Sequence, residues 1–181
     1  MPLIIVLVIG VVMAVKAVVE QALPPAGWRV GPLWVHVSHN PGVAFGLGAS
    51  GPGWLVLVVP AVMVTGLLVA SWRSVSGGRR WQGAGLALAA GGGLANLLDR
   101  APDRVVTDYL DLGWWPSFNL ADATLVSALT WLALQWWRTD RADRADRADR
   151  ADRADRSSAA AAPAAAVQRP DPDRVESKEN R

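Results

Sequence analysis

The stretch from Gly91 to Asp122, GGGLANLLDRAPDRVVTDYLDLGWWPSFNLAD, decides how this chain folds. It sets carboxylate, carboxamide and guanidinium side chains between two apolar runs, at Asn96, Asp99, Arg100, Asp108, Asp111, Asn119 and Asp122. Polar groups beside long apolar segments are costly unless they have partners or a chemical task. We therefore expect a site in this stretch and a supporting role for the sequence around it.

The apolar content of the chain indicates a membrane protein. Of its 181 residues, 51% are hydrophobic and ten are tryptophan. Long apolar segments lie at about residues 3–23, 54–72, 81–98 and 116–137. A helix of about 20 residues crosses the roughly 30 Å of bilayer hydrocarbon. The sequence therefore predicts an all-α membrane protein with four transmembrane helices.

Between the first two apolar segments the pattern changes to that of strands. Apolar and polar residues alternate from Trp28 to Val37, which predicts a small extracytoplasmic β-rich region between the first and second helices. His36 and His39 are three positions apart with no carboxylate near them in the sequence, so a solvated strand edge is favoured over a metal pair.

The loop that follows, HNPGVAFGLG, has Asn40 and Gly42 at positions that suit a chain folding back closely, with Ala44 and Phe45 dipping into the bilayer. A plain turn is the alternative.

The arginines of one short connection predict the orientation. Arg73, Arg79 and Arg80 lie within residues 73–80, which contain no acid. By the positive-inside rule this connection is cytoplasmic, so both termini are cytoplasmic and the loops 24–53 and 99–117 face outward. With Ser117 as the N-cap of the fourth helix, Asp122 would lie about 7 Å below the start of that helix, near the outer surface.

The first and third helices carry further polar residues. Lys16 and Glu20 are four positions apart and can pair near the outer end of the first helix, with snorkelling of Lys16 as the alternative. The third helix is dense in Gly and Ala, whose small side chains permit close packing in lipid, so we expect it at the centre of the bundle. Asn96 and Arg100 share one face at its outer end.

After Arg138 the sequence becomes a charged, low-complexity tail. Asp-Arg-Ala triplets run from Asp140 to Arg156, and their period of three residues gives a helix no apolar stripe. We expect residues 1–137 to form the membrane domain and residues 138–181 to form a disordered cytoplasmic tail. A solvated helix with pairs such as Asp140 and Arg144, or a contact with anionic lipid, is the alternative.

Asp108 and Asp122 form a candidate acid pair. They are 14 positions apart with Pro116 between them, so they cannot share one helix, but the short outer loop returns the chain to the membrane surface where it left. Two adjacent carboxylates cannot both ionise easily, so one keeps a proton while the other acts as a base on water, as in aspartic proteases.

Three nearby side chains could assist such a pair. Asn96, Arg100 and Asn119 would orient the carboxyl groups and hold a substrate carbonyl or its developing oxyanion. From spacing alone, Asp108 and Asp111 can equally be solvated loop acids, and Asp122 an acid satisfied by backbone donors at a helix terminus.

Other functional classes fit the sequence less well. A small carrier or channel needs polar residues through the full depth of the membrane, but the second apolar segment has only Thr65 and Ser71. A scaffold protein gives no reason for the cluster of polar residues at one level. With no cysteine in the chain, a disulfide, a thiolate metal site and a cysteine nucleophile are excluded. The formal charge of +2 indicates no nucleic-acid partner.

Four segments, HNPGVAFG, GGGLANLLDR, RVVTDYLDL and FNLAD, in this order between the apolar runs, resemble the lipoprotein signal peptidases (signal peptidase II), which are bacterial membrane aspartyl proteases. The resemblance covers about residues 1–137. It implies that Asp108 and Asp122 are the catalytic aspartates. It further implies a substrate-binding or supporting set, which comprises Lys16, Asn40, Gly42, Asn96, Asp99, Arg100 and Asn119.

The chain departs from the family pattern in three places. Ala95 stands where the family usually has Gly, and Val12 stands where an Asp usually precedes Lys16. Glu20, four residues after Lys16, is expected to take over the missing pairing. The triplet tail also lies outside the pattern.

The resemblance implies an aspartic endopeptidase that removes the signal peptide of prolipoproteins just before a diacylglyceryl-modified cysteine. Its expected location is the bacterial cytoplasmic (inner) membrane, with the active site near the outer surface. It implies lipid-modified prolipoproteins and membrane lipids as partners, a monomeric state, and no metal or organic cofactor.

Overall fold

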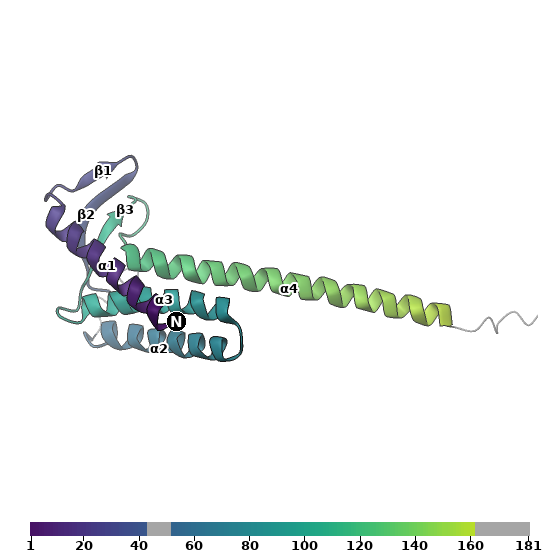
Figure 1. The fold of residues 1–181 in the computed structure, drawn as a ribbon. Helices are drawn as coiled ribbons and strands as arrows, with labels where there is room; N and C mark the ends of the chain where they lie inside the picture. Colours follow the sequence, from purple (N-terminus) through teal and green to yellow (C-terminus); the bar gives the residue numbers. More distant parts are fainter. Residues whose placement is uncertain (43–51, 162–181) are drawn as a thin grey trace, which may run out of the picture. The chain divides into compact units, whose positions relative to one another are not determined.

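The computed structural model describes residues 1–42 and 52–161 (Figure 1). Along the chain the elements are α1 (Pro2–Ala22), β1 (Trp28–Val30), β2 (Leu33–Asn40), α2 (Leu55–Ser76), α3 (Arg80–Arg100), β3 (Val106–Asp111) and α4 (Leu120–Ala161). The structure is thus mostly helical with one small sheet, as predicted. The part of the HNPGVAFGLG loop with Ala44 and Phe45 lies outside the described residues. The chain divides into two compact units, Met1–Trp136 and Trp137–Arg181.

Helices α1 and α2 are long and apolar enough to cross a membrane, judged by length and composition. Many of their large apolar side chains face outward: Leu3 is 69% exposed and Val62 is 66% exposed. Such side chains gain free energy when lipid covers them. Within the described residues α3 and α4 do not meet the same criterion. For α3, the small side chains of Gly and Ala that favour close packing also lower its hydropathy.

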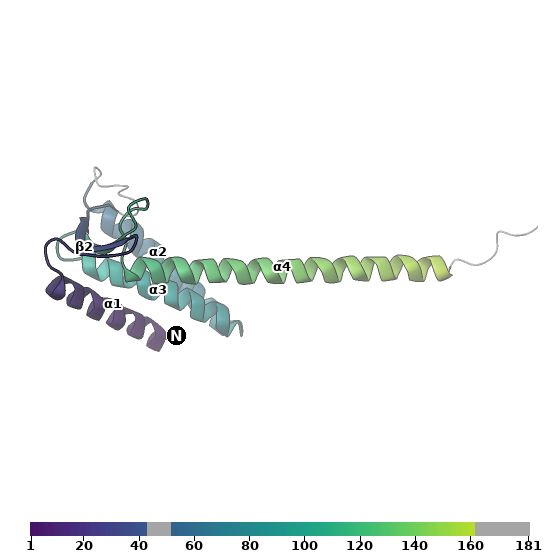
Figure 2. The same ribbon diagram turned by 90° about the horizontal axis from the view of Figure 1, so that it is seen from above.

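Helix α3 is the centre of the first unit, as its small residues predict. A Cβ atom at Gly91 would meet Val8 of α1, one at Gly93 would meet Val64 of α2, and one at Gly92 would lie 2.6 Å from the backbone oxygen of Ala121 in α4. Three consecutive glycines therefore allow three helices to approach the same helix. In Figures 1 and 2, α3 runs beside α1, α2 and the first turns of α4.

The sheet has the order β1-β2-β3, with both pairs antiparallel. Strands β1 and β2 come from the predicted β-rich region between the first two helices. Strand β3 comes from between α3 and α4, where the sequence predicted only a loop. Its register places Asp108 opposite Ser38, next to an irregularity of β2 between Val35 and Ser38. The prediction was incomplete because the polar residues of β3 mask the period of a strand.

Helix α4 begins later than predicted. Its first residue is Leu120, and Ser117 does not cap it. The side-chain oxygen of Asn119 accepts the backbone N–H of Asp122 at 3.1 Å, and the carboxylate of Asp122 accepts the backbone N–H of Asn119 at 3.2 Å. This reciprocal pair is a capping box. Asp122 therefore lies in the first turn of α4 rather than about 7 Å below the start of the helix.

The second unit contains α4 from Trp137 onward. Residues 138–161 are helical, which corresponds to the solvated-helix alternative and not to the disordered segment that the sequence favoured for this part. Exposed arginines pair with aspartates four residues earlier, as in Arg144 with Asp140 at 2.6 Å and Arg150 with Asp146 at 2.6 Å. Each such pair adds only about 0.3–0.5 kcal/mol to a helix.

Candidate active site

Asn119, the residue that caps α4, joins two carboxylates. Its side-chain NH2 group donates to Asp108 Oδ1 at 3.1 Å and to Asn96 Oδ1 at 2.9 Å, while its backbone N–H donates to Asp122 Oδ2. The three elements that meet here are β3, α3 and α4. Asn119 is only 3% exposed. The pair of acids predicted from the sequence is thus brought to one buried residue.

Asp108, in the middle of β3, is 2% exposed. Besides the bond from Asn119, its Oδ2 accepts a hydrogen bond from the side-chain NH2 group of Asn40 at 3.1 Å. Burial and, second, the negative charge of Asp122 raise the pKa of Asp108 from its usual 3.8 to about 6. The two carboxamide donors and the Arg100 charge oppose this rise in pKa. Asp108 can therefore exchange a proton near neutral pH.

Asp122 is held by a second carboxamide. The side-chain NH2 group of Asn96 donates to Asp122 Oδ1 at 2.6 Å, and Oδ2 accepts the capping bond from Asn119. The first turn of a helix also favours a negative charge, because its free N–H groups point toward it. Both oxygens of Asp122 thus have donors.

Arg100 links the end of α3 to the residues that follow β2. Its Nη2 atom donates to the carbonyl oxygen of Gly42, and the residue is 3% exposed. Its Nε atom has no hydrogen-bond partner within the described residues. A buried, unpaired donor beside two carboxylates is costly unless something binds it.

Lys16 of α1 lies between two acids, Glu20 and Asp99. It pairs with Asp99 Oδ1 and lies 3.3 Å from Glu20 Oε1, which confirms the predicted pairing of Lys16 with Glu20. Asp99 also accepts the backbone N–H of Thr107 at 2.8 Å. Lys16 and Asp99 therefore support β3 and do not contact the two candidate aspartates through any described hydrogen bond.

One of the two histidines of β2 contacts a carboxylate of β3. Nε2 of His36 lies 3.1 Å from Asp111 Oδ2 across β2 and β3, a contact that the sequence did not reveal because β3 was not predicted. No group of three or more metal-ligating side chains gathers anywhere in residues 1–42 and 52–161. Asp111 is separate from the pair on Asn119, since it bonds to His36 and to the backbone N–H of Gly113.

Sequence reasoning missed two residues of this region. The hydroxyl oxygen of Tyr109 accepts the backbone N–H of Leu120, and Thr107 donates its hydroxyl to Glu20. The strand pairing that orients them was not predicted. The Asn119-x-x-Asp122 spacing, by contrast, is a capping-box pattern that the sequence already contained.

A cavity of about 220 Å³ opens beside Asp108. It is lined by Ser38, His39, Asn40, Pro41, Asp108, Pro116 and Ser117. A carboxyl group that can hold a proton, a second carboxyl nearby and space for water or a peptide are the parts required for acid–base attack of water on an amide.

The family model described as "Signal peptidase (SPase) II" matches residues 4–138. Proteins named lipoprotein signal peptidase share 41% identity over 96 residues in Syntrophomonas wolfei, 36% over 113 in Aeromonas hydrophila and 42% over 97 in Moorella thermoacetica. These matches cover 53%, 59% and 54% of this chain. They span 62%, 67% and 63% of the three relatives.

The fold is also similar to that of two solved structures described as bacterial membrane enzymes. One aligns with a TM-score of 0.61 and 21% identity over 78% of this chain and 88% of its own. The other aligns with a TM-score of 0.58 and 22% identity over 74% of this chain and 90% of its own. At these identities the likeness concerns the fold.

Proposed function

The chain belongs to the signal peptidase II family, and on this basis we propose that it is an aspartic endopeptidase that cleaves prolipoproteins just before a diacylglyceryl-modified cysteine. One observation carries the proposal: Asp108 and Asp122 both accept hydrogen bonds from Asn119. A scaffold or a carrier gives no reason to bring two acids to one buried asparagine.

In the proposed reaction one carboxyl group of the pair keeps a proton while the other accepts a proton from water. The hydroxide formed attacks the carbonyl carbon of the scissile amide, and the protonated carboxyl group donates to the carbonyl oxygen. The carboxyl group that took the proton from water then gives it to the amide nitrogen, so the C–N bond breaks and the new amine leaves. As the C=O bond re-forms, the proton on the former carbonyl oxygen returns to the other carboxylate. Asn40 and Asn96 hold the outer oxygens of Asp108 and Asp122 in place. No metal or organic cofactor takes part.

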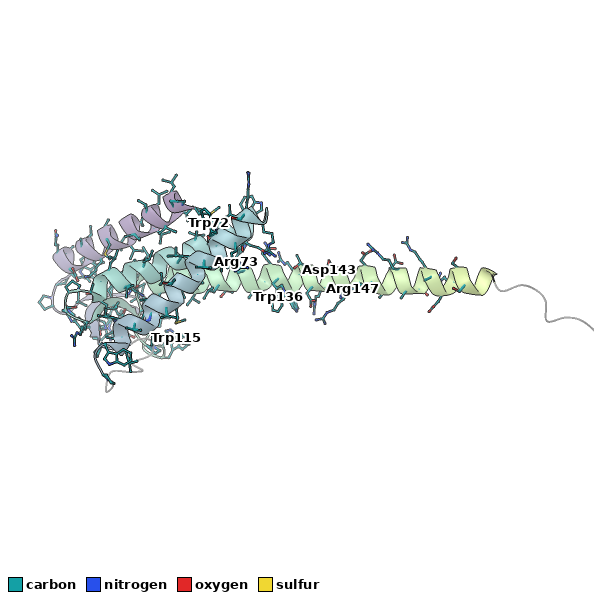
Figure 3. All side chains as sticks on the ribbon, turned by 90° about the horizontal axis from the view of Figure 1, so that it is seen from below. Trp72, Arg73, Trp115, Trp136, Asp143 and Arg147 are labelled. Atoms are coloured by element: carbon teal, nitrogen blue, oxygen red, sulfur yellow. The ribbon has the colours of Figure 1, made fainter. Side chains whose placement is uncertain are left out.

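We propose that four helices span the membrane: α1, α2, α3 and the part of α4 before Arg138. The aromatic residues support this arrangement, because Trp is enriched at membrane interfaces. Trp54 is the N-cap of α2, and Trp72 lies with Arg73 toward the other end of that helix (Figure 3). The arginines of the α2–α3 connection would then be cytoplasmic, with both termini, and the sheet would be outside. Reporter fusions after Arg80 and after Arg138 test this, and an external signal at either point would overturn it.

The proposed partners, lipid-modified prolipoproteins and membrane lipids, follow from membership of the family. A substrate with a membrane-spanning signal and lipid chains would reach the site by lateral diffusion in the bacterial inner membrane, and its scissile bond would lie near the outer surface. One chain supplies the residues that hold both aspartates, so a monomer would be sufficient for activity.

The test is cleavage by the purified protein in lipid-containing micelles. A diacylglyceryl-modified prolipoprotein should be cut before its modified cysteine by the wild type and not by Asp122→Asn. The same prolipoprotein without the lipid should be a much poorer substrate. Full turnover by a folded Asp122→Asn protein would overturn the aspartyl mechanism, and no turnover by the folded wild type would overturn the function.

A further inference from the structure

Thr107 precedes Asp108 on β3, and two carboxylates from other elements hold it. Asp99 Oδ2 accepts its backbone N–H at 2.8 Å, and Glu20 Oε1 accepts its hydroxyl hydrogen at 3.0 Å. Thr107 is 5% exposed. Both the main chain and the side chain of the residue before Asp108 are therefore anchored.

Lys16 closes these contacts into a ring. It pairs with Asp99 Oδ1 and lies 3.3 Å from Oε1 of Glu20, the same oxygen that accepts the Thr107 hydroxyl. The ring thus runs from Lys16 to Asp99, to Thr107, to Glu20 and back to Lys16. It ties α1 and α3 to β3.

The edge of β3 that faces away from β2 shows what the ring of contacts does. One edge of β3 pairs with β2. On the other edge the N–H groups of Tyr109 and Leu110 donate to the carbonyl oxygen of Phe118. Residues 107 and 109 direct their N–H groups to the same side of a strand. Thr107 would therefore have an unpaired donor next to Asp108 if Asp99 did not accept it.

We propose that Glu20 is a positioning residue that sets the place of Asp108 by holding the Thr107 hydroxyl, with Lys16 fixing the Glu20 carboxylate. The inference rests on the proposed peptidase function. Glu20 touches neither Asp108 nor Asp122 through a described hydrogen bond, so it acts through Thr107. A small displacement of a reacting group can lower a rate by orders of magnitude.

The first test measures cleavage by Thr107→Val, Thr107→Ser, Glu20→Ala and the double variant Glu20→Ala/Thr107→Val. Valine keeps the shape of threonine without the hydroxyl, so kcat should fall about tenfold, as for one lost hydrogen bond, with KM changed little. Serine should restore kcat. The double variant should be no worse than the poorer single one. Additive losses, a Ser variant as poor as Val, or a changed KM at constant kcat would each overturn the proposal.

The second test needs no turnover, so it separates this inference from the proposed function. Amide hydrogen exchange of residues 106–109 should be faster in Glu20→Ala than in the wild type, because the strand loses one anchor. Gln21→Ala, at an exposed neighbouring position of α1, is the matched control and should leave exchange unchanged. Equal exchange in Glu20→Ala and the wild type would overturn the ring as an anchor, whether or not the protein cleaves prolipoproteins.

Discussion

The side-chain NH2 group of Asn119 donates to Asp108 Oδ1 over 3.1 Å, and this bond joins the start of α4 to the middle of β3. The same residue caps α4 through its side-chain oxygen. Asn119 therefore has two separable tasks, one in stability and one in the geometry of the proposed dyad.

Replacement of Asn119 by serine should separate these tasks. Serine is a good N-cap but is too short to reach Asp108, so Asn119→Ser should unfold near the wild-type temperature and lose most of its cleavage activity. Asn119→Ala should lose activity and also about 1 kcal/mol of stability through the missing cap. Thermal unfolding and cleavage rates of both variants check this. A Ser variant with wild-type kcat would show that the bond to Asp108 is dispensable.

The two aspartates should behave as one unit. Asp108→Asn and Asp122→Asn should each reduce kcat to near background, and the double variant should be little worse than either single one. Asp111→Asn is the internal control, because Asp111 bonds to His36 and Gly113 and not to the pair. Among the four purified variants, we expect Asp111→Asn to cleave much faster than the other three. A larger loss at Asp111 than at Asp108 would move the catalytic role to Asp111.

The stability of the protein should fall with rising pH because of Asp108. Its pKa is raised from 3.8 to about 6, first by burial and then by the charge of Asp122, so folding favours the protonated form. The contribution is present below pH 4 and is lost as the pH rises through 6. From the size of the shift, the loss is about 3 kcal/mol.

Thermal unfolding at pH 4 and pH 7 tests this contribution. The loss of stability between the two values should be smaller in Asp108→Asn than in the wild type. In Asp108→Asn the new side chain faces the donors of Asn40 and Asn119 at every pH, which alters the stability of the variant throughout. The test therefore compares the change in stability between the two pH values, not the stability at either one. Asp111→Asn is the control, because hydrogen bonds lower the pKa of Asp111 and it stays ionised over this range. The same pH dependence in Asp108→Asn and the wild type would contradict the assignment.

The helices and the acids were predictable, but the sheet that orients them was only half predictable. Helical segments and the small-residue face of α3 follow from composition and local spacing, which a single sequence displays. Strand β3 depends on pairing with β2 more than 60 positions earlier, and its polar residues carry no strand period. The contacts of Thr107 and His36 depend on this pairing, so no local pattern could have found them. The later start of α4 was locally encoded, because the spacing of Asn119 and Asp122 matches a capping box.

Removal of the tail should leave the site intact. The described tail residues from Arg141 to Ser158 are exposed, and their paired charges bury no apolar surface. A protein ending at Arg138 should therefore insert, fold and cleave as the full chain does. Cleavage rate and thermal unfolding of both forms check this. A truncated protein that folds normally and does not cleave would assign the tail a role in catalysis.

The close approach of α3 and α4 should be sensitive to a single methyl group. A Cβ atom at Gly92 would lie 2.6 Å from the backbone oxygen of Ala121, next to Asp122, and a backbone atom cannot move aside as a flexible side chain does. Gly92→Ala should therefore separate the two helices, at a cost of about 1–3 kcal/mol, and reduce kcat because Asp122 moves with α4. Gly66→Ala in α2 is the matched control, since nothing lies within 4 Å of its added Cβ atom. Alanine at an open helical position should cost no stability. Equal unfolding temperatures and cleavage rates for the two variants would show that α3 and α4 do not pack through Gly92.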